Sequence, residues 1–198
     1  TGATEGGQIA VSAGNIRVDS GSGGLTGIRS RAENGTGNGG DLDIAAANNM
    51  LLTNDGVIAS DTVTSGKAGS VEVTVAGTLA VHNGAYIDSS TYSSSDAGSV
   101  KVSASSLTLE RAAISSGTYD QGSGNAGYVD VAASNSLTLL NGGLIESSTW
   151  SSGNAGVVGV RAGSLTIDGR GGGSTGIFSV ARDGSTGQAG RVEVEVRL

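Results

Sequence analysis

The chain has 198 residues, of which 36 are glycine, none is proline or cysteine, and only 3% are aromatic. This composition argues against an ordinary compact domain, whose core depends on large side chains and whose glycine content is near 7%. The formal net charge is −7 and the 11 basic residues are scattered, so we expect no nucleic-acid partner. No apolar run approaches the roughly 20 residues that cross a bilayer, so we expect no membrane insertion.

A repeated motif runs along the whole chain. Glycine opens a stretch of the form G-x-(V/I/L)-x-(V/I) seven times, at spacings of 33, 29, 29, 29, 29 and 34 residues. A fixed period between 20 and 50 residues is typical of solenoids. We therefore predict a single solenoid segment over residues 1–198, whose coils start near Gly7, Gly40, Gly69, Gly98, Gly127, Gly156 and Gly190.

Within each period the apolar residues alternate with polar ones, which is the pattern of a strand and not of a helix. In the coil that opens at Gly69, the alternation covers residues 71–75, resumes at 79–81 and ends around Ile87. The same three groups return in the following coils. The pattern predicts an all-β fold, a parallel β-helix with three short strands in each coil, a period of 29 residues and about six coils.

Turn residues separate the predicted strands. The pairs Asn83-Gly84 and Asn141-Gly142 tolerate positive φ, and we expect the same of Gly127 and Gly156, where coils begin. The abundance of glycine thus follows from the number of corners.

Stacked coils should place like residues above one another, and the sequence does so in four columns that we expect to point inward. Their members are Ile9, Leu42, Val71, Val100, Val129, Val158 and Val192; Ile16, Met50, Leu79, Leu107, Leu137 and Leu165; Ile28, Ile58, Ile87, Ile114, Ile145 and Ile177; and Ser30, Ser60, Ser89, Ser116, Ser147 and Ser179. We expect the buried serine hydroxyls to bond to one another or to the backbone. Asp43, Glu72, Lys101 and Asp130 form an outward column in which Lys101 can meet acidic groups on both sides.

The phrase GNAGYVDVAASNSLTLLNGGLIESSTWSSGNAG, from Gly124 to Gly156, resembles the repeat of large filamentous-haemagglutinin-like exoproteins of Gram-negative bacteria, which are secreted by the two-partner route. The resemblance extends from Gly6 to the end of the chain. It implies a right-handed β-helix at the bacterial cell surface or outside the cell, with roles in adhesion, aggregation or display. The segment TGATEGGQIA at the start has no signal-peptide pattern, so export would depend on a signal elsewhere.

Our leading interpretation is a structural shaft of a secreted or cell-surface adhesin-like exoprotein. Both ends of the repeat look open, which predicts that the chain continues a longer shaft or stacks end to end with copies of itself. A surface glycan or a receptor on a neighbouring cell is a further candidate partner.

One alternative is a carbohydrate-binding or lateral-association module. Tyr92, Tyr119 and Trp150 fall at the same outward position on three successive coils, and we call them the aromatic column. Aromatic rings in such a column could stack on sugars, pack against another shaft, or form a ladder that only stabilises the fold.

The other alternative is a polysaccharide-active enzyme, because such enzymes also use β-helices and need two carboxylates in a groove. Asp43 with Glu72, or Asp88 with residues on adjoining coils, are the candidate pairs. We expect no groove at either place, and therefore no catalysis and no catalytic residue. We expect no cofactor and no metal, although calcium at corners such as Asn54-Asp55 stays open.

Overall fold

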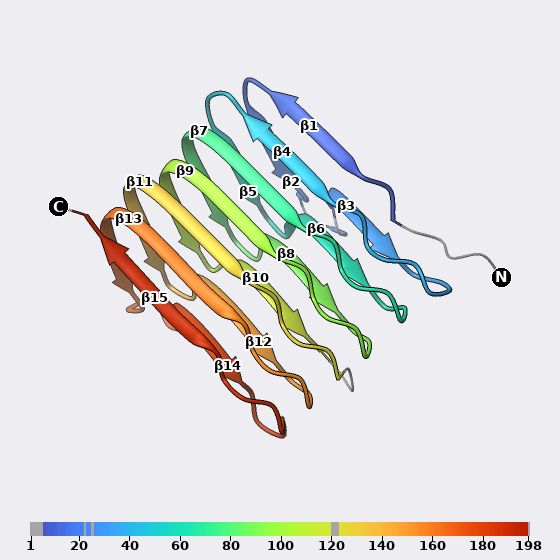
Figure 1. Cartoon of the computed structure of the whole chain (residues 1–198). Helices are drawn as coiled ribbons and strands as arrows, with labels where there is room; N and C mark the ends of the chain where they lie inside the picture. Colours follow the sequence, from blue (N-terminus) through green and yellow to red (C-terminus); the bar gives the residue numbers. More distant parts are fainter. Residues whose placement is uncertain (1–5, 22, 25, 120–122, 198) are drawn as a thin grey trace.

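A computed structural model of the chain describes residues 6–21, 23, 24, 26–119 and 123–197. Figure 1 shows the strands stacked coil upon coil, with the first and last coils at opposite ends of the stack. Strands are the only regular elements in this part of the chain, and every strand pair is parallel. The predicted parallel β-helix of about six coils is confirmed.

The first two coils each contain three strands, as the alternation predicts. They are β1 (Ile9–Ala13), β2 (Ile16–Asp19) and β3 (Thr26–Ala32), followed by β4 (Leu42–Ala46), β5 (Met50–Thr53) and β6 (Gly56–Thr62).

The next four coils differ, because their first and second predicted strands run together as one long strand that is followed by a short one. The pairs are β7 (Val71–His82) with β8 (Tyr86–Thr91), β9 (Val100–Glu110) with β10 (Ala113–Thr118), β11 (Val129–Leu140) with β12 (Leu144–Thr149), and β13 (Val157–Asp168) with β14 (Gly176–Ala181); β15 (Arg191–Val196) begins a seventh coil. A register shift between residues 75 and 78 marks the bend in β7. A similar register shift lies in β11, between residues 133 and 136.

The strands form two parallel sheets. One follows the order β1-β4-β7-β9-β11-β13-β15, with β2 and β5 alongside, and the other follows β3-β6-β8-β10-β12-β14. We call these the long sheet and the short sheet. Because each coil contributes to both, the core lies between them and runs along the stack.

The inward columns are confirmed in the middle of the stack. Leu79, Leu107, Ile87 and Ile114, for example, are fully buried. The members on the first and last coils are more open, and Val192 on β15 is 40% exposed. Medium aliphatic side chains fill the narrow interior, which explains why the core needs no aromatic residue.

The prediction that the glycines opening the coils have positive φ is wrong. Asn83, Gly84, Asn141 and Gly142 have positive φ as expected, whereas the coil-opening glycines do not. At Gly127 a Cβ atom would lie 1.9 Å from the backbone oxygen of the coil-opening glycine beneath it. Glycine is required there because the coils stack too closely for a side chain.

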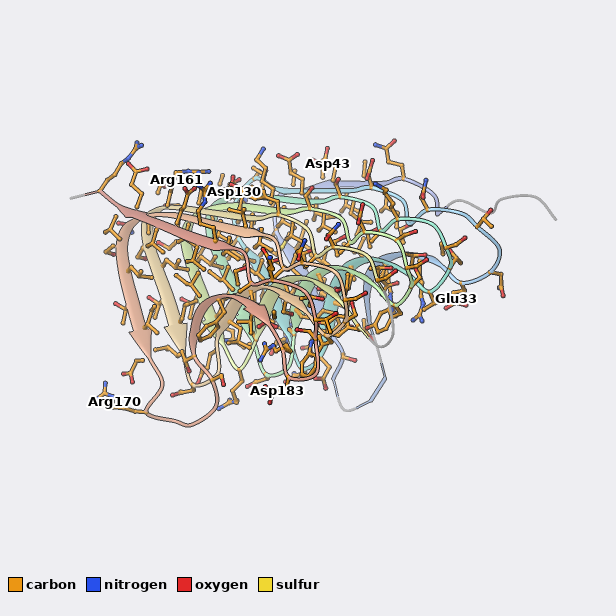
Figure 2. All side chains as sticks on the ribbon, turned by 60° about the horizontal axis from the view of Figure 1, so that its bottom comes forward. Glu33, Asp43, Asp130, Arg161, Arg170 and Asp183 are labelled. Carbon is orange, nitrogen blue, oxygen red and sulfur yellow. The ribbon has the colours of Figure 1, made fainter. Side chains whose placement is uncertain are left out.

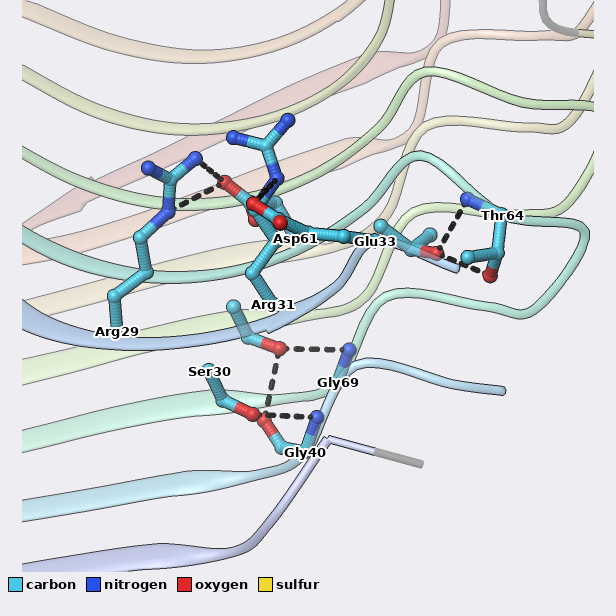
Figure 3. Close-up of polar contacts among 10 residues, drawn as sticks. Arg29, Ser30, Arg31, Glu33, Gly40, Asp61, Thr64 and Gly69 are labelled. Atoms are coloured by element: carbon cyan, nitrogen blue, oxygen red, sulfur yellow. Dashed lines mark hydrogen bonds and ion pairs between the residues drawn. The ribbon is translucent and has the colours of Figure 1, made fainter. Parts of the chain in front are cut away.

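The serine column connects successive coils through the backbone. Ser147 Oγ donates to the oxygen of Gly127 at 2.8 Å and accepts from the amide of Gly156 at 2.8 Å. Figure 3 shows the equivalent bonds at Ser30, Gly40 and Gly69 near the start of the stack. The prediction that these buried hydroxyls bond to the backbone is confirmed. Ser147, for example, bonds to the first glycine of its own coil and to the first glycine of the next.

Candidate functional site

The aromatic column exists, but it divides into two parts. The amides of Tyr92, Tyr119 and Trp150 donate to the coil beneath at 2.9, 2.9 and 3.0 Å, so the three residues occupy equivalent places. The rings of Tyr92 and Tyr119 stack at 5.3 Å with 25° between their planes. Trp150 instead contacts Arg182, whose guanidinium carbon lies 5.2 Å from the ring centre. Tyr92 is 41% and Trp150 45% exposed, whereas Tyr119 is more buried.

The outer face of the short sheet is covered, which the sequence did not indicate. Ser90 points outward by alternation but is fully buried, and Asp88, Ser115 and Glu146 are nearly so. These side chains are buried because aromatic rings fold back over the strands. A Cβ atom added to Gly117, for example, would lie 3.3 Å from the Tyr119 ring. Gly117 therefore leaves the room that this ring occupies.

Beside these rings lies a groove of about 400 Å³, which we call the outer groove. The sequence led us to expect no groove at Asp88, and the structure corrects this. Its floor is the outer face of the short sheet, and its sides are the tyrosines and the corner that precedes each short strand. Its lining includes Arg29, Asp61, Tyr86, Asp88, Tyr92, Arg111, Ser115, Tyr119 and Glu146. Trp150 is not among its lining residues.

Asp88 is the distinctive group of the outer groove. It is 7% exposed, and its Oδ1 accepts hydrogen bonds from Ser90 at 2.8 Å and from Ser115 at 2.7 Å. Burial raises the pKa of Asp88 to about 6, opposed by these two hydroxyls and supported by the charges of Asp61 and Glu146. No cation pairs with Asp88 among the residues that the structure describes.

The two neighbouring carboxylates, in contrast, are held by arginine. Asp61 accepts from Arg29 Nε at 3.0 Å and lies 3.7 Å from Arg31 Nε, as Figure 3 shows. Glu146 forms an ion pair with Arg182. Asp88 is therefore the one carboxylate of the three whose charge is left uncompensated by a partner.

The corner at Arg111 has an unusual backbone. Its φ is +47°, where the equivalent corners of other coils have Asn83 or Asn141. Arg111 Nη2 donates to Asn83 Oδ1 at 2.6 Å, which fixes the side chain at the edge of the outer groove. A residue other than glycine or asparagine is uncommon in this conformation.

The remaining candidates lie elsewhere. Asp43 is paired in register with Glu72 on the outer face of the long sheet, and Lys101 contacts Glu72 at 2.7 Å. Asp130 does not share Lys101 as expected but pairs with Arg161 at 2.8 Å. Figure 2 shows Asp43, Asp130 and Arg161 on this same face, which the sequence had suggested would carry charges.

Within the described ranges, no three His, Cys, Asp or Glu side chains come together as a metal ion would require. The same ranges contain no helix with the length and apolar character of a membrane span.

The comparisons with known proteins leave the family open. No protein-family model matches the chain, no curated protein is significantly similar to it, and no solved structure matches its fold significantly. Function has to be argued from the coil stack and from the outer groove. The sequence pointed to Tyr92, Tyr119 and Asp88, whereas Arg29, Arg111 and Glu146 were missed because only the fold brings them together.

Proposed function

We propose that this chain is a structural shaft segment of a secreted or cell-surface adhesin-like exoprotein of the filamentous-haemagglutinin type, which extends and presents other regions. The observation that carries the proposal is the pairing of equivalent residues from one coil to the next along the stack. Residues at the same place in the repeat pair with one another from coil to coil, for example Leu42 with Val71, Val71 with Val100, and Val100 with Val129. Because each coil is fixed against its neighbours, the two ends of such a stack keep a constant orientation relative to each other.

A structural role is favoured over catalysis by the state of the carboxylates. Glycoside hydrolysis needs one carboxyl group that donates a proton and a second that acts as a free base or nucleophile. Asp88 has the raised pKa of a proton donor, but Asp61 and Glu146 are engaged by arginine. Release of reducing ends from neutral or acidic polysaccharides by the purified chain would contradict this part of the proposal.

End-to-end association is part of the proposed role. Val192, Val194 and Val196 on β15 are 40%, 46% and 43% exposed, and Val192 continues an inward column that is buried in the coils before it. A further coil, from the same chain or from a second copy, would cover these side chains. Electron microscopy over a range of concentrations distinguishes rods that lengthen with concentration from particles of constant length.

The presenting role is tested by changing the number of coils. Residues 98–126 are duplicated, and the distance between dyes on the first coil and on a reporter fused after the last coil is measured by single-molecule energy transfer. The distance should increase by about 4.8 Å for the added coil with an equally narrow distribution. A distribution as broad as that of a flexible linker would overturn the shaft proposal.

Antibody labelling of intact source cells tests the surface location, and labelling only after lysis would contradict it.

A further inference from the structure

The outer groove is a built site and not a gap between coils. Asp88, Ser115 and Glu146 follow one another in register on β8, β10 and β12 and form its floor. The stacked rings of Tyr92 and Tyr119 form one side, and Arg111 lies on the other. Because neighbouring parallel strands lie about 4.8 Å apart, the floor offers a regular row of positions along the stack.

Asp88 on this floor is only partly satisfied by hydrogen bonds within the described part of the chain. Asp88 Oδ1 accepts both serine hydroxyls, whereas no hydrogen bond to Oδ2 is found among the described residues. The side chain as a whole is more than nine-tenths buried. A buried carboxylate that lacks a cation is unfavourable unless donors reach it, so a ligand that donates to Oδ2 would be stabilised.

The charges around the groove argue against a charged ligand. The lining mixes both signs of charge, because Arg29 is paired with Asp61 and Glu146 with Arg182, which leaves Asp88 and Arg111 as opposite charges within the same lining. Three phenols, those of Tyr86, Tyr92 and Tyr119, lie along the same space, and burial raises the pKa of each, so all three remain protonated at neutral pH. The groove thus offers hydroxyl groups, a carboxylate that pairs with no cation of the described residues and the apolar surface of aromatic rings.

We propose that the outer groove binds a neutral saccharide chain, with the Oδ2 atom of Asp88 accepting a sugar hydroxyl and the Tyr92 and Tyr119 rings contacting the apolar face of the sugar. Sugars combine hydroxyl groups with apolar ring faces, and this combination matches the lining. Because the floor runs across successive coils, an oligosaccharide laid along the stack fits better than a single sugar. This inference goes beyond the shaft proposal and does not depend on it.

The backbone of Arg111 supports the proposal independently. Its positive φ is less favourable for arginine than for asparagine or glycine at such a corner. The corner nevertheless holds an arginine whose guanidinium group is fixed at the edge of the outer groove by Asn83. Strained residues of this kind tend to gather at ligand sites.

The test uses the purified chain and a panel of neutral oligosaccharides, namely cellopentaose, maltopentaose and mannopentaose, with oligogalacturonate and spermidine as charged comparators. Saturation-transfer NMR detects binding, and calorimetry measures affinity for the oligosaccharide that responds. Asp88→Asn should weaken binding at least tenfold, because a hydrogen bond to a carboxylate is stronger than one to a neutral amide. Tyr119→Phe, which keeps the ring, should weaken it less.

Asp43→Asn is the matched control, because it removes an exposed carboxylate from the outer face of the long sheet. It should leave affinity unchanged, and circular dichroism should show all three variants folded. Three outcomes would overturn the inference: no transfer to any neutral oligosaccharide at millimolar concentration, affinity that Asp88→Asn leaves intact, or tighter binding of either charged comparator. A failure here leaves the shaft proposal standing, because that proposal depends only on the stack.

Discussion

Asp88→Asn should stabilise the protein at neutral pH and lose that advantage in acid. Burial raises the pKa of Asp88 from 3.8 to about 6, so the folded state binds this proton more tightly than the unfolded chain does. The proton therefore contributes stability that is fully present below pH 4 and is lost as the pH rises through 6. At roughly 1.4 kcal/mol for each pKa unit, the charged carboxylate costs about 3 kcal/mol at pH 7.

The asparagine carries no charge to desolvate, and its side-chain oxygen can still accept from Ser90 and Ser115. We therefore expect the variant to gain up to about 3 kcal/mol in free energy of unfolding at pH 7. By pH 4.5 the wild type recovers about 2 kcal/mol of this difference through protonation. Urea denaturation followed by circular dichroism at both pH values measures the difference, and Asp43→Asn is the control for a surface carboxylate. A stability difference that stays constant between the two pH values, or that grows in acid, would refute the reasoning.

Three further substitutions test the stack and its corners. Gly127→Ala should destabilise the protein by more than about 3 kcal/mol or prevent folding, because its Cβ would lie 1.9 Å from a backbone oxygen. Gly7→Ala is the control: it lies at the same place in the first coil, a Cβ there meets nothing within 4 Å, and the melting temperature should not change. Ser147→Ala leaves two partly buried backbone groups without a partner and should cost about 2 to 4 kcal/mol by urea denaturation, whereas Ser103→Ala on an outward position should stay within about 0.5 kcal/mol. Arg111→Asn places a residue that tolerates positive φ at this corner, so it should raise or maintain the melting temperature while weakening any saccharide binding. A melting temperature lower by several degrees would contradict the assignment of strain to this corner.

The interior of the fold could be predicted from the sequence because two periodicities coincide. Alternation within a coil determines which side chains point inward, and the repeat places each beneath its equivalent in the next coil. Leu79 above Met50 is a direct consequence of both. The Asn83-Gly84 corner could also be predicted, since asparagine and glycine favour the positive φ that both residues adopt there.

The outer surface could not be predicted in the same way. Alternation indicates that Ser90 points outward, but not that the ring of Tyr119 returns over the strand and buries it. The choice of ion partners is equally hidden, because it depends on the reach of long side chains. Asp130 pairs with Arg161, which lies two residues away from its register partner on β13, and not with Lys101, which lies directly opposite on β9. The close approach of coils at Gly127 is a property of the stack and has no local sequence pattern.

The inner and outer positions of the short sheet obey different constraints, and this difference connects the shaft with the outer groove. The inward column keeps isoleucine from coil to coil because a narrow core accepts one shape. The outward column beside it changes at every step, from Ala59 to Asp88, Ser115 and Glu146. Two carboxylates in direct succession would repel at this spacing, and Ser115 separates them while donating to Asp88. The outer positions thus differ from coil to coil while the strands keep their pairing, so a rigid shaft can carry a specific binding groove on its surface.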